Sequence, residues 1–87
     1  MKTELSILCR QKGSRKKYFS IAIEPLDGGF VVPFLLHRQG KPDRSGTKTP
    51  QGAVSYEKAK RAYESAIWHR LADGYRVENS ERMIEQC

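Results

Sequence analysis

The spacing of apolar residues changes once along this chain, at Ser55, and this change limits the folds that it can adopt. Before Ser55, apolar and polar residues alternate, most clearly over residues 17–24. A period of two predicts strands with one buried face. After Ser55, apolar residues recur at every third or fourth position, which predicts one helix near residues 55–72 with a single apolar face. That face contains Tyr56, Ala59, Ala62, Tyr63, Ala66 and Ile67 and ends at Arg70.

Both ends of this helix have sequence signals. Ser55 is a favourable N-cap, and Gly74 is a favourable left-handed residue just past the C-terminal end. Because Ala66 lies on the apolar face, an Asp there is expected to unfold the domain, whereas Lys60 at the margin is expected to tolerate Glu. After the helix, the chain forms either a short strand through Val77 or one helical turn from Ser80.

The alternating segments are expected to form an antiparallel sheet. Strands are predicted over residues 5–9, 17–24, 30–38 and 47–49. Pro33 has no N–H to give to a neighbouring strand, so it marks a sheet edge or a bulge. An α+β fold follows, with a four- to five-stranded antiparallel sheet and one α-helix packed across it. The 87 residues form a single domain, in which 77–87 is a loosely attached tail.

The net charge of +6 is confined to one half of the chain. Residues 1–48 hold ten Lys and Arg against four Asp and Glu, whereas residues 49–87 hold six of each kind. Such an asymmetry indicates an anionic partner, with nucleic acid as the first candidate and a membrane surface or an acidic protein behind it. Solubility of a small protein explains the same excess equally well, so charge alone does not decide.

A basic run between the predicted sheet and the helix contains most of the candidate binding residues. It covers residues 36–48 and holds four cations and one carboxylate, shaped by two glycines and a proline. Because a guanidinium can hold a phosphate with two parallel hydrogen bonds, and because Arg38 ends a predicted strand whereas Lys41 and Arg44 lie in the predicted loop, Arg38 is expected to contribute most. The predicted phosphate-binding residues are Arg38, Lys41, Arg44 and Lys48, extended by Lys16 and Lys17.

The order of these segments resembles the WGR domain, a module of poly(ADP-ribose) polymerases and of many small bacterial proteins. The resemblance covers roughly residues 5–76, from the first strand to the end of the helix. Matching positions are Lys17, Tyr18, Phe19, Arg38, Gly40, Gly46, Ser55, Ala59, Arg70, Gly74 and Tyr75. The tripeptide that names the family reads Leu36-His37-Arg38 here, so its Trp and its Gly are replaced.

This resemblance implies a WGR-like α+β fold and a non-enzymatic DNA-binding module. In the polymerases, the Trp and Arg of the tripeptide help to engage DNA near a strand break. The resemblance therefore implies a DNA-binding role for Arg38, while Leu36 provides no stacking surface for a base.

The sequence contains no recognisable catalytic, metal-binding or cofactor-binding constellation. His37 and His69 have no second His or Cys at ligand spacing, and no nucleophile is paired with a base. We therefore expect a protein that is not an enzyme and that needs no metal and no cofactor. Cys9 and Cys87 do not suggest a disulfide framework, and no signal peptide or membrane span is recognisable. These features favour a soluble cytoplasmic protein that does not enter a membrane.

A second interpretation makes the chain a protein-interaction adaptor. Its contact surface would be an exposed strand edge near Pro33 together with Trp68, which lies opposite the apolar face of the helix. In a small domain such a Trp more often packs against a terminal segment, here residues 76–87, and this is expected for Trp68. Arg70 is expected to extend toward solvent or to bond the carbonyls of a strand, rather than to contact a ligand.

Overall fold

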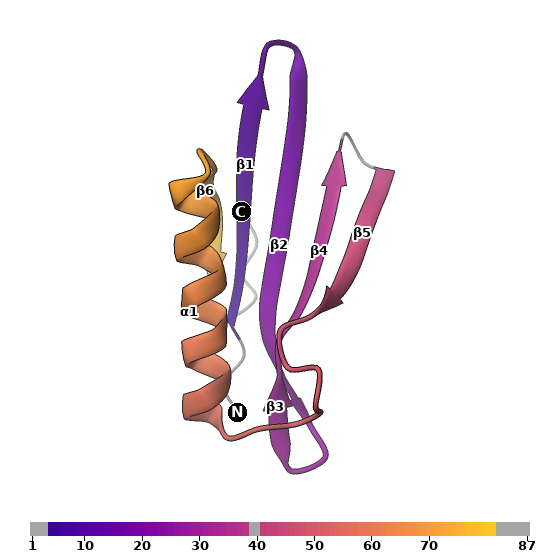
Figure 1. Cartoon of the computed structure of the whole chain (residues 1–87), viewed down its shortest axis with the longest axis vertical. Coiled ribbons are helices and arrows are strands. Elements are labelled where there is room, and N and C mark those ends of the chain that lie inside the picture. The colour runs from indigo at the N-terminus through magenta and orange to yellow at the C-terminus, as the bar shows by residue number, and fades with distance from the viewer. Residues whose placement is uncertain (1–3, 39–40, 82–87) are drawn as a thin grey trace.

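One antiparallel sheet with a single helix packed against it makes up the described part of the chain (Figure 1). The computed structural model describes residues 4–38 and 41–81. The strands lie in the order β5-β4-β2-β1-β6, and β3 pairs with the end of β2. This confirms the α+β class, with six strands where the sequence predicted four or five. The strands are β1 (Glu4–Lys12), β2 (Arg15–Leu26), β3 (Gly29–Val31), β4 (Pro33–Arg38), β5 (Lys41–Thr47) and β6 (Arg76–Glu81).

The hairpin of β1 and β2 forms the centre of the sheet, and its tip extends beyond the end of the helix (Figure 1). The two strands pair from Glu4 with Ile23 to Lys12 with Arg15. Gly13 in the turn has a φ of 65°, a conformation that glycine adopts without a steric penalty. Because the hairpin extends beyond α1, the helix does not cover either sheet face near the hairpin tip.

The segment after the helix adds an edge strand to the sheet. β6 pairs antiparallel with β1, from Leu5 with Glu81 to Cys9 with Arg76. Of the two conformations left open by the sequence, the strand is the one observed, and it continues to residue 81. Residues 77–81 thus belong to the sheet and are not a loose tail, while 82–87 lie outside the described residues.

Most of the predicted basic loop is a strand. β4 and β5 form a hairpin in which Pro33 pairs with Thr47, so the strand predicted over residues 47–49 begins earlier and ends at Thr47. Pairing with β4 outweighs the low strand propensity of Pro, Asp and Gly in β5. Because β4 lies between β2 and β5, the predicted sheet edge at Pro33 is wrong. Pro33 is instead the first residue of its strand, a position where a missing N–H is tolerated.

The helix α1 (Tyr56–Ala72) has the boundaries that the sequence predicted. At its start, the Ser55 side chain accepts a hydrogen bond from the backbone N–H of Lys58 at 3.2 Å. At its end, Gly74 has a φ of 95°, and the N–H of Tyr75 donates to the carbonyl of Arg70 at 3.0 Å. The caps satisfy backbone groups that would otherwise lack partners, and the left-handed glycine turns the chain back toward β6.

The core lies between α1 and the sheet face that it covers. Along β2, Phe19, Ile21 and Ile23 alternate with more exposed residues and are almost completely inaccessible to solvent. Burying one such side chain stabilises a fold by about 1.5–3 kcal/mol. The predicted apolar face of α1 is confirmed, because the buried residues of the helix, Ala59, Tyr63 and Ala66, all lie on this face. The core contains Leu8, Phe19, Ile21, Ile23, Val32, Ala59, Tyr63, Ala66 and Tyr75.

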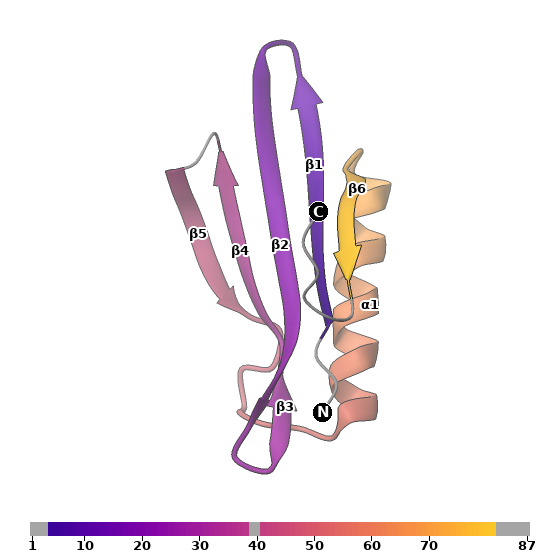
Figure 2. The same ribbon diagram turned by 180° about the vertical axis from the view of Figure 1, so that it is seen from behind.

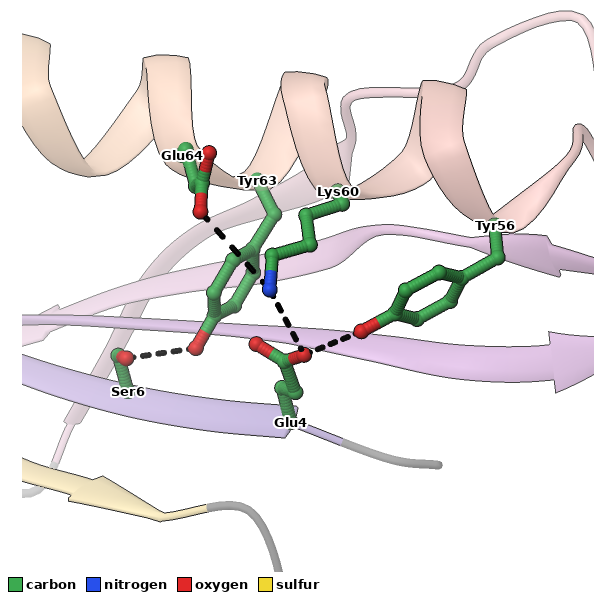
Figure 3. A network of polar contacts seen from close by, with 6 residues as sticks. All are labelled: Glu4, Ser6, Tyr56, Lys60, Tyr63 and Glu64. Carbon is green, nitrogen blue, oxygen red and sulfur yellow. Dashed lines mark hydrogen bonds and ion pairs between the residues drawn. The ribbon is translucent and has the colours of Figure 1, made fainter. Parts of the chain in front are cut away.

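A row of polar contacts, here named the polar seam, joins α1 to β1 at one margin of this core (Figure 3). The Glu4 carboxylate accepts a hydrogen bond from the Tyr56 hydroxyl and lies 3.6 Å from the Lys60 ammonium. Lys60 also lies 3.9 Å from the carboxylate of Glu64, one helical turn further along. Deeper in the seam, the hydroxyls of Ser6 and Tyr63 share a buried hydrogen bond of 2.6 Å. The seam fixes the position of the helix on β1 without leaving these groups unpaired.

Candidate nucleic-acid interface

The helix covers only part of the sheet face on which it packs. In Figure 1, α1 lies beside β1 and β6, whereas no helix lies on β4 or β5, and the view from behind in Figure 2 shows none there either. Side chains at this end of the sheet therefore share a face with the core and still reach the surface.

The pairing register places two predicted phosphate-binding residues on this uncovered area. Lys17 lies opposite Arg38, two residues beyond the pair of Phe19 and Leu36. Side chains two residues apart in a strand point to the same face of a sheet, so Lys17 and Arg38 share the face of the buried Phe19. Both residues are exposed. The alternation that builds the core thus continues beyond it as a row of cations.

A bulge in β5 brings Lys41 and Arg44 to the same face. Residues three apart in a regular strand point to opposite faces. Here Arg44 pairs with Leu36. Lys41 pairs with Arg38, and Asp43 between them has no partner on β4 because the register shifts. Because the bulge adds one residue between Lys41 and Arg44, the two side chains point to the same face of the sheet, which is also the face of Arg38.

Lys48 joins this face just after β5. Its ammonium nitrogen lies 4.8 Å from the ring centre of Phe34, and the Phe34 and Phe19 ring centres are 5.9 Å apart. The Phe34 ring can lie there because residue 46 is a glycine, since a Cβ at Gly46 would come within 2.9 Å of a ring atom. Five predicted residues therefore share one surface, named the basic face below. It consists of Lys17, Arg38, Lys41, Arg44 and Lys48, all exposed.

Lys16 lies apart from the basic face. As the neighbour of Lys17 in β2, it points to the opposite face of the sheet, where it lines a pocket of about 590 Å³ with Cys9 and Gln11. The expectation that Lys16 and Lys17 extend one surface therefore holds in the geometry for Lys17 only.

The sequence predicted Arg38 on a strand and Lys41 and Arg44 in a loop, but all three are strand residues. Lys41 and Arg44 lie on β5 and are held by backbone pairing with β4 just as Arg38 is held by pairing with β2. The argument that a strand position alone sets Arg38 apart is therefore wrong. What distinguishes Arg38 and Arg44 from the lysines is the planar guanidinium, which can hold a phosphate through two hydrogen bonds.

The basic face is not neutralised by carboxylates. Among residues 4–38 and 41–81, none of its five cations has an ion-pair partner. By contrast, Arg10 on β1 lies 3.4 Å from the carboxylate of Asp73 and donates to the Asp73 carbonyl at 3.0 Å. An anion approaching the basic face would meet positive charges that no neighbouring acid in the described residues offsets.

Arg70 adjoins this surface, although sequence reasoning had not made it a binding residue. Its guanidinium carbon lies 4.5 Å from the ring centre of Phe19 and 5.5 Å from that of Tyr75. It lines a cleft of about 370 Å³ together with Lys48. The sequence signal was its place at the end of the apolar face of α1, one helical turn past Ala66, which puts it over the sheet.

Two aromatic features lie away from the basic face. Trp68 is 69% exposed, so the prediction that it packs against the segment after the helix is wrong for the described residues 76–81. On the opposite face of the sheet, His37 stacks on Tyr18, with ring centres 5.1 Å apart, and its Nε2 lies 3.4 Å from the Ser20 hydroxyl. His37 is thus occupied in a contact within the sheet.

Within the described ranges, no group of three or more His, Cys, Asp or Glu side chains is arranged to hold a metal ion. The single helix found there is too short and too polar to cross a membrane. Comparison with known proteins found no matching family model, no matching curated protein and no matching solved structure.

Proposed function

We propose that this protein is a non-enzymatic nucleic-acid-binding module that contacts the phosphate backbone through its basic face. The observation that carries the proposal is the gathering of Lys17, Arg38, Lys41, Arg44 and Lys48 on one uncovered sheet face, without carboxylate partners among the described residues. Contacts to phosphate give affinity without sequence information, so binding is expected to be independent of sequence.

The size of the basic face limits how tight this binding can be. Its cations lie on β2, β4 and β5, and neighbouring strands are about 4.8 Å apart, so the face spans only about 10 Å across the strands. Such a surface neutralises a few phosphates. We expect a dissociation constant on the order of micromolar at moderate salt and a shallow dependence on salt, with a log–log slope of about −3.

We further propose that the chain is a divergent WGR domain. The arrangement of one helix on an antiparallel sheet agrees with what that resemblance implies. Two matching glycines have structural reasons to be there: Gly46 makes room for the ring of Phe34, and Gly74 ends the helix with a positive φ. We also place the protein in the cytoplasm, where nucleic acid is accessible to it.

The adaptor remains an alternative function, and it now rests on Trp68 alone. The strand edge near Pro33 is absent, because Pro33 is paired with β5. An exposed Trp on the outer surface of α1 is the kind of side chain that protein interfaces use as an anchor.

A salt titration with a matched pair of double variants tests the proposal. Binding of a labelled generic duplex is followed by fluorescence anisotropy from low to high salt, with single-stranded DNA and duplex RNA as further ligands. In one variant, Arg38 and Lys41 are replaced by Ala. In the control, the exposed Arg61 and Lys58 on the outer surface of α1 are replaced by Ala, which removes the same charge.

We expect the Arg38/Lys41 variant to bind more weakly and with a salt slope smaller by about 2, while the Arg61/Lys58 variant binds like the parent protein. Equal losses in both variants would mean that net charge alone drives binding. No binding at low salt would contradict the proposal and favour the adaptor.

A further inference from the structure

Arg70 has an arrangement that packing alone does not require. Its guanidinium carbon lies over the rings of Phe19 and Tyr75, at 4.5 and 5.5 Å from their centres. The side chain is half-buried, and among the described residues it has neither a hydrogen-bond acceptor nor an ion-pair partner. A guanidinium carries five N–H donors in its plane. None of these donors has an acceptor among the described residues, so they are available to a ligand.

These donors are not used to cap the helix. The carbonyl of Arg70 accepts from the N–H of Asp73 and from that of Tyr75, each at 3.0 Å. The carbonyl of Leu71 accepts from the N–H of Gly74 at 3.1 Å. Backbone donors thus satisfy the last turn. The expectation that Arg70 bonds carbonyls of a neighbouring strand is also wrong within the described residues, because its recorded contacts are with aromatic rings.

Lys48 places a second cation beside Arg70. Lys48 lies over the ring of Phe34 at 4.8 Å, and Arg70 lies over the ring of Phe19 at 4.5 Å. The two ring centres are only 5.9 Å apart. Both cations line the cleft between the C-terminal turn of α1 and the sheet. Two neighbouring positive charges repel each other, and this repulsion is relieved when an anion lies between them.

The acidic residue that lines this cleft is already engaged. Asp73 also lines the cleft, but its carboxylate lies 3.4 Å from the guanidinium of Arg10 on β1. Among the described residues, Asp73 makes no ion pair with Arg70 or Lys48. The cleft therefore offers an anion one fixed guanidinium and one ammonium.

We propose that Arg70 and Lys48 form a phosphate subsite in this cleft. The planar rim of Arg70 would bond two phosphate oxygens, and Lys48 would supply the second charge. Because two rings already hold Arg70 in place, little side-chain freedom is lost when the anion binds. The subsite deepens the proposed function and rests on it for the source of the phosphate, since Lys48 belongs to both the cleft and the basic face. A nucleic-acid phosphodiester and free phosphate share the required chemistry.

The first experiment uses inorganic phosphate as the ligand and the arginine Nε–H resonances in NMR spectra as the readout. Phosphate is expected to shift the Arg70 resonance at lower concentrations than any other arginine resonance. In Arg70→Lys, which keeps the charge and loses the planar fork, phosphate binding measured on backbone resonances around the cleft should be lost. Arg61→Lys makes the same change on the outer surface of α1 and should leave binding unchanged. Equal shifts at all arginines would overturn the subsite.

The second experiment uses the generic duplex and does not depend on Arg70, whose replacement also removes packing on Phe19. Lys48 and Lys58 are both exposed, so neither Lys48→Gln nor Lys58→Gln should unfold the domain. We expect Lys48→Gln to weaken duplex binding about threefold and to reduce the salt slope by about one. Lys58→Gln should change neither. Identical titrations for the two variants would contradict the subsite.

The two experiments separate the subsite from the proposed function. If the duplex binds and the Arg38/Lys41 variant weakens it, while Lys48→Gln has no effect, the subsite is wrong and the proposed function stands. If phosphate binds in the cleft and no duplex binds at low salt, the nucleic acid is wrong as the source and free phosphate is the ligand. If neither ligand binds, both proposals fail.

Discussion

Two regions of one sheet face contrast with each other in this protein. Under α1, the side chains of β2 that point to the helix are Phe19, Ile21 and Ile23, all buried. Beyond the helix, the next side chain on the same face of the same strand is Lys17, which is exposed. The backbone geometry is the same in both regions. What differs is whether a helix covers the face, so the boundary of the candidate interface is the boundary of α1.

The two regions also differ in how their charges are paired. In the polar seam, Lys60 lies between the carboxylates of Glu4 and Glu64. On the basic face, neither Arg38 nor Arg44 has a carboxylate partner in the described part of the chain. The cations of the basic face are therefore available to an anionic ligand and contribute little to the stability of the fold.

The largest effect is expected from placing a charge in the covered region. Ala66 on α1 is 7% exposed and packs in the core, so Ala66→Asp would bury a carboxylate that Arg70, one helical turn further on, compensates only in part, at a cost of about 2–4 kcal/mol. That is a large part of the stability of a small domain. Ser65→Asp introduces the same group at the adjacent exposed position and should be tolerated. Thermal unfolding followed by circular dichroism distinguishes them, and equal melting temperatures would show that the helix face is misassigned.

A smaller loss of stability is expected at the polar seam. The sequence suggested that Lys60 tolerates Glu, but the structure places its ammonium between Glu4 and Glu64. Lys60→Glu would bring a third carboxylate to this place, and because the site is partly exposed we expect a loss of about 1–2 kcal/mol. Adding Glu4→Gln to this variant should recover part of that loss. If denaturant unfolding gives additive effects for the two changes, the pair at 3.6 Å does not couple them.

The next prediction concerns the uncovered region and leaves stability unchanged. Arg38→Ala and Arg44→Ala should each weaken duplex binding about threefold to tenfold, and Lys41→Ala should weaken it less, because only a guanidinium holds a phosphate with two hydrogen bonds. All three residues are exposed strand residues, so the melting temperature is expected to stay near that of the parent protein. Anisotropy titrations at one salt concentration give the order. A larger effect for Lys41→Ala than for both arginines would refute the bidentate contact.

Sequence patterns predicted which helix and strands occur in this fold better than they predicted where the strands begin and end. The period of the apolar residues identified α1 within one residue of its start, because Ser55 and Gly74 determine the caps locally. The extent of β5 was missed, since its Pro, Asp and Gly residues disfavour a strand and only pairing with β4 stabilises it. The bulge at Asp43 was not predictable for the same reason: it depends on the register between two strands, which single-residue preferences do not determine.

In the candidate site, too, the local sequence predicted some features, while others depend on how the helix and the strands pack. The pattern of charges along the sequence identified all five residues of the basic face. It gave no ligand-binding role to Arg70, whose position over Phe19 depends on how the helix packs on the sheet. The charge count also grouped Lys16 with Lys17, although neighbours in a strand point to opposite faces. Net charge does not depend on which way side chains point, whereas membership of a binding surface does.

The sharpest test of the comparison, and the one with the smallest expected effect, uses these two neighbouring lysines. Lys17→Ala and Lys16→Ala remove the same charge one residue apart in β2, so an account based on net charge predicts equal losses of binding. Lys17 lies opposite Arg38 on the basic face, whereas Lys16 lies on the other face of the sheet beside Gln11.

We expect Lys17→Ala to weaken duplex binding about twofold to threefold and to lower the salt slope by about one, with no change for Lys16→Ala. Paired titrations on one duplex, with the parent protein measured beside them, resolve a difference of this size. Equal weakening by the two variants would mean that the uncovered face does not define the interface. A larger loss for Lys16→Ala would move the interface to the opposite face, beside the stacked pair of Tyr18 and His37.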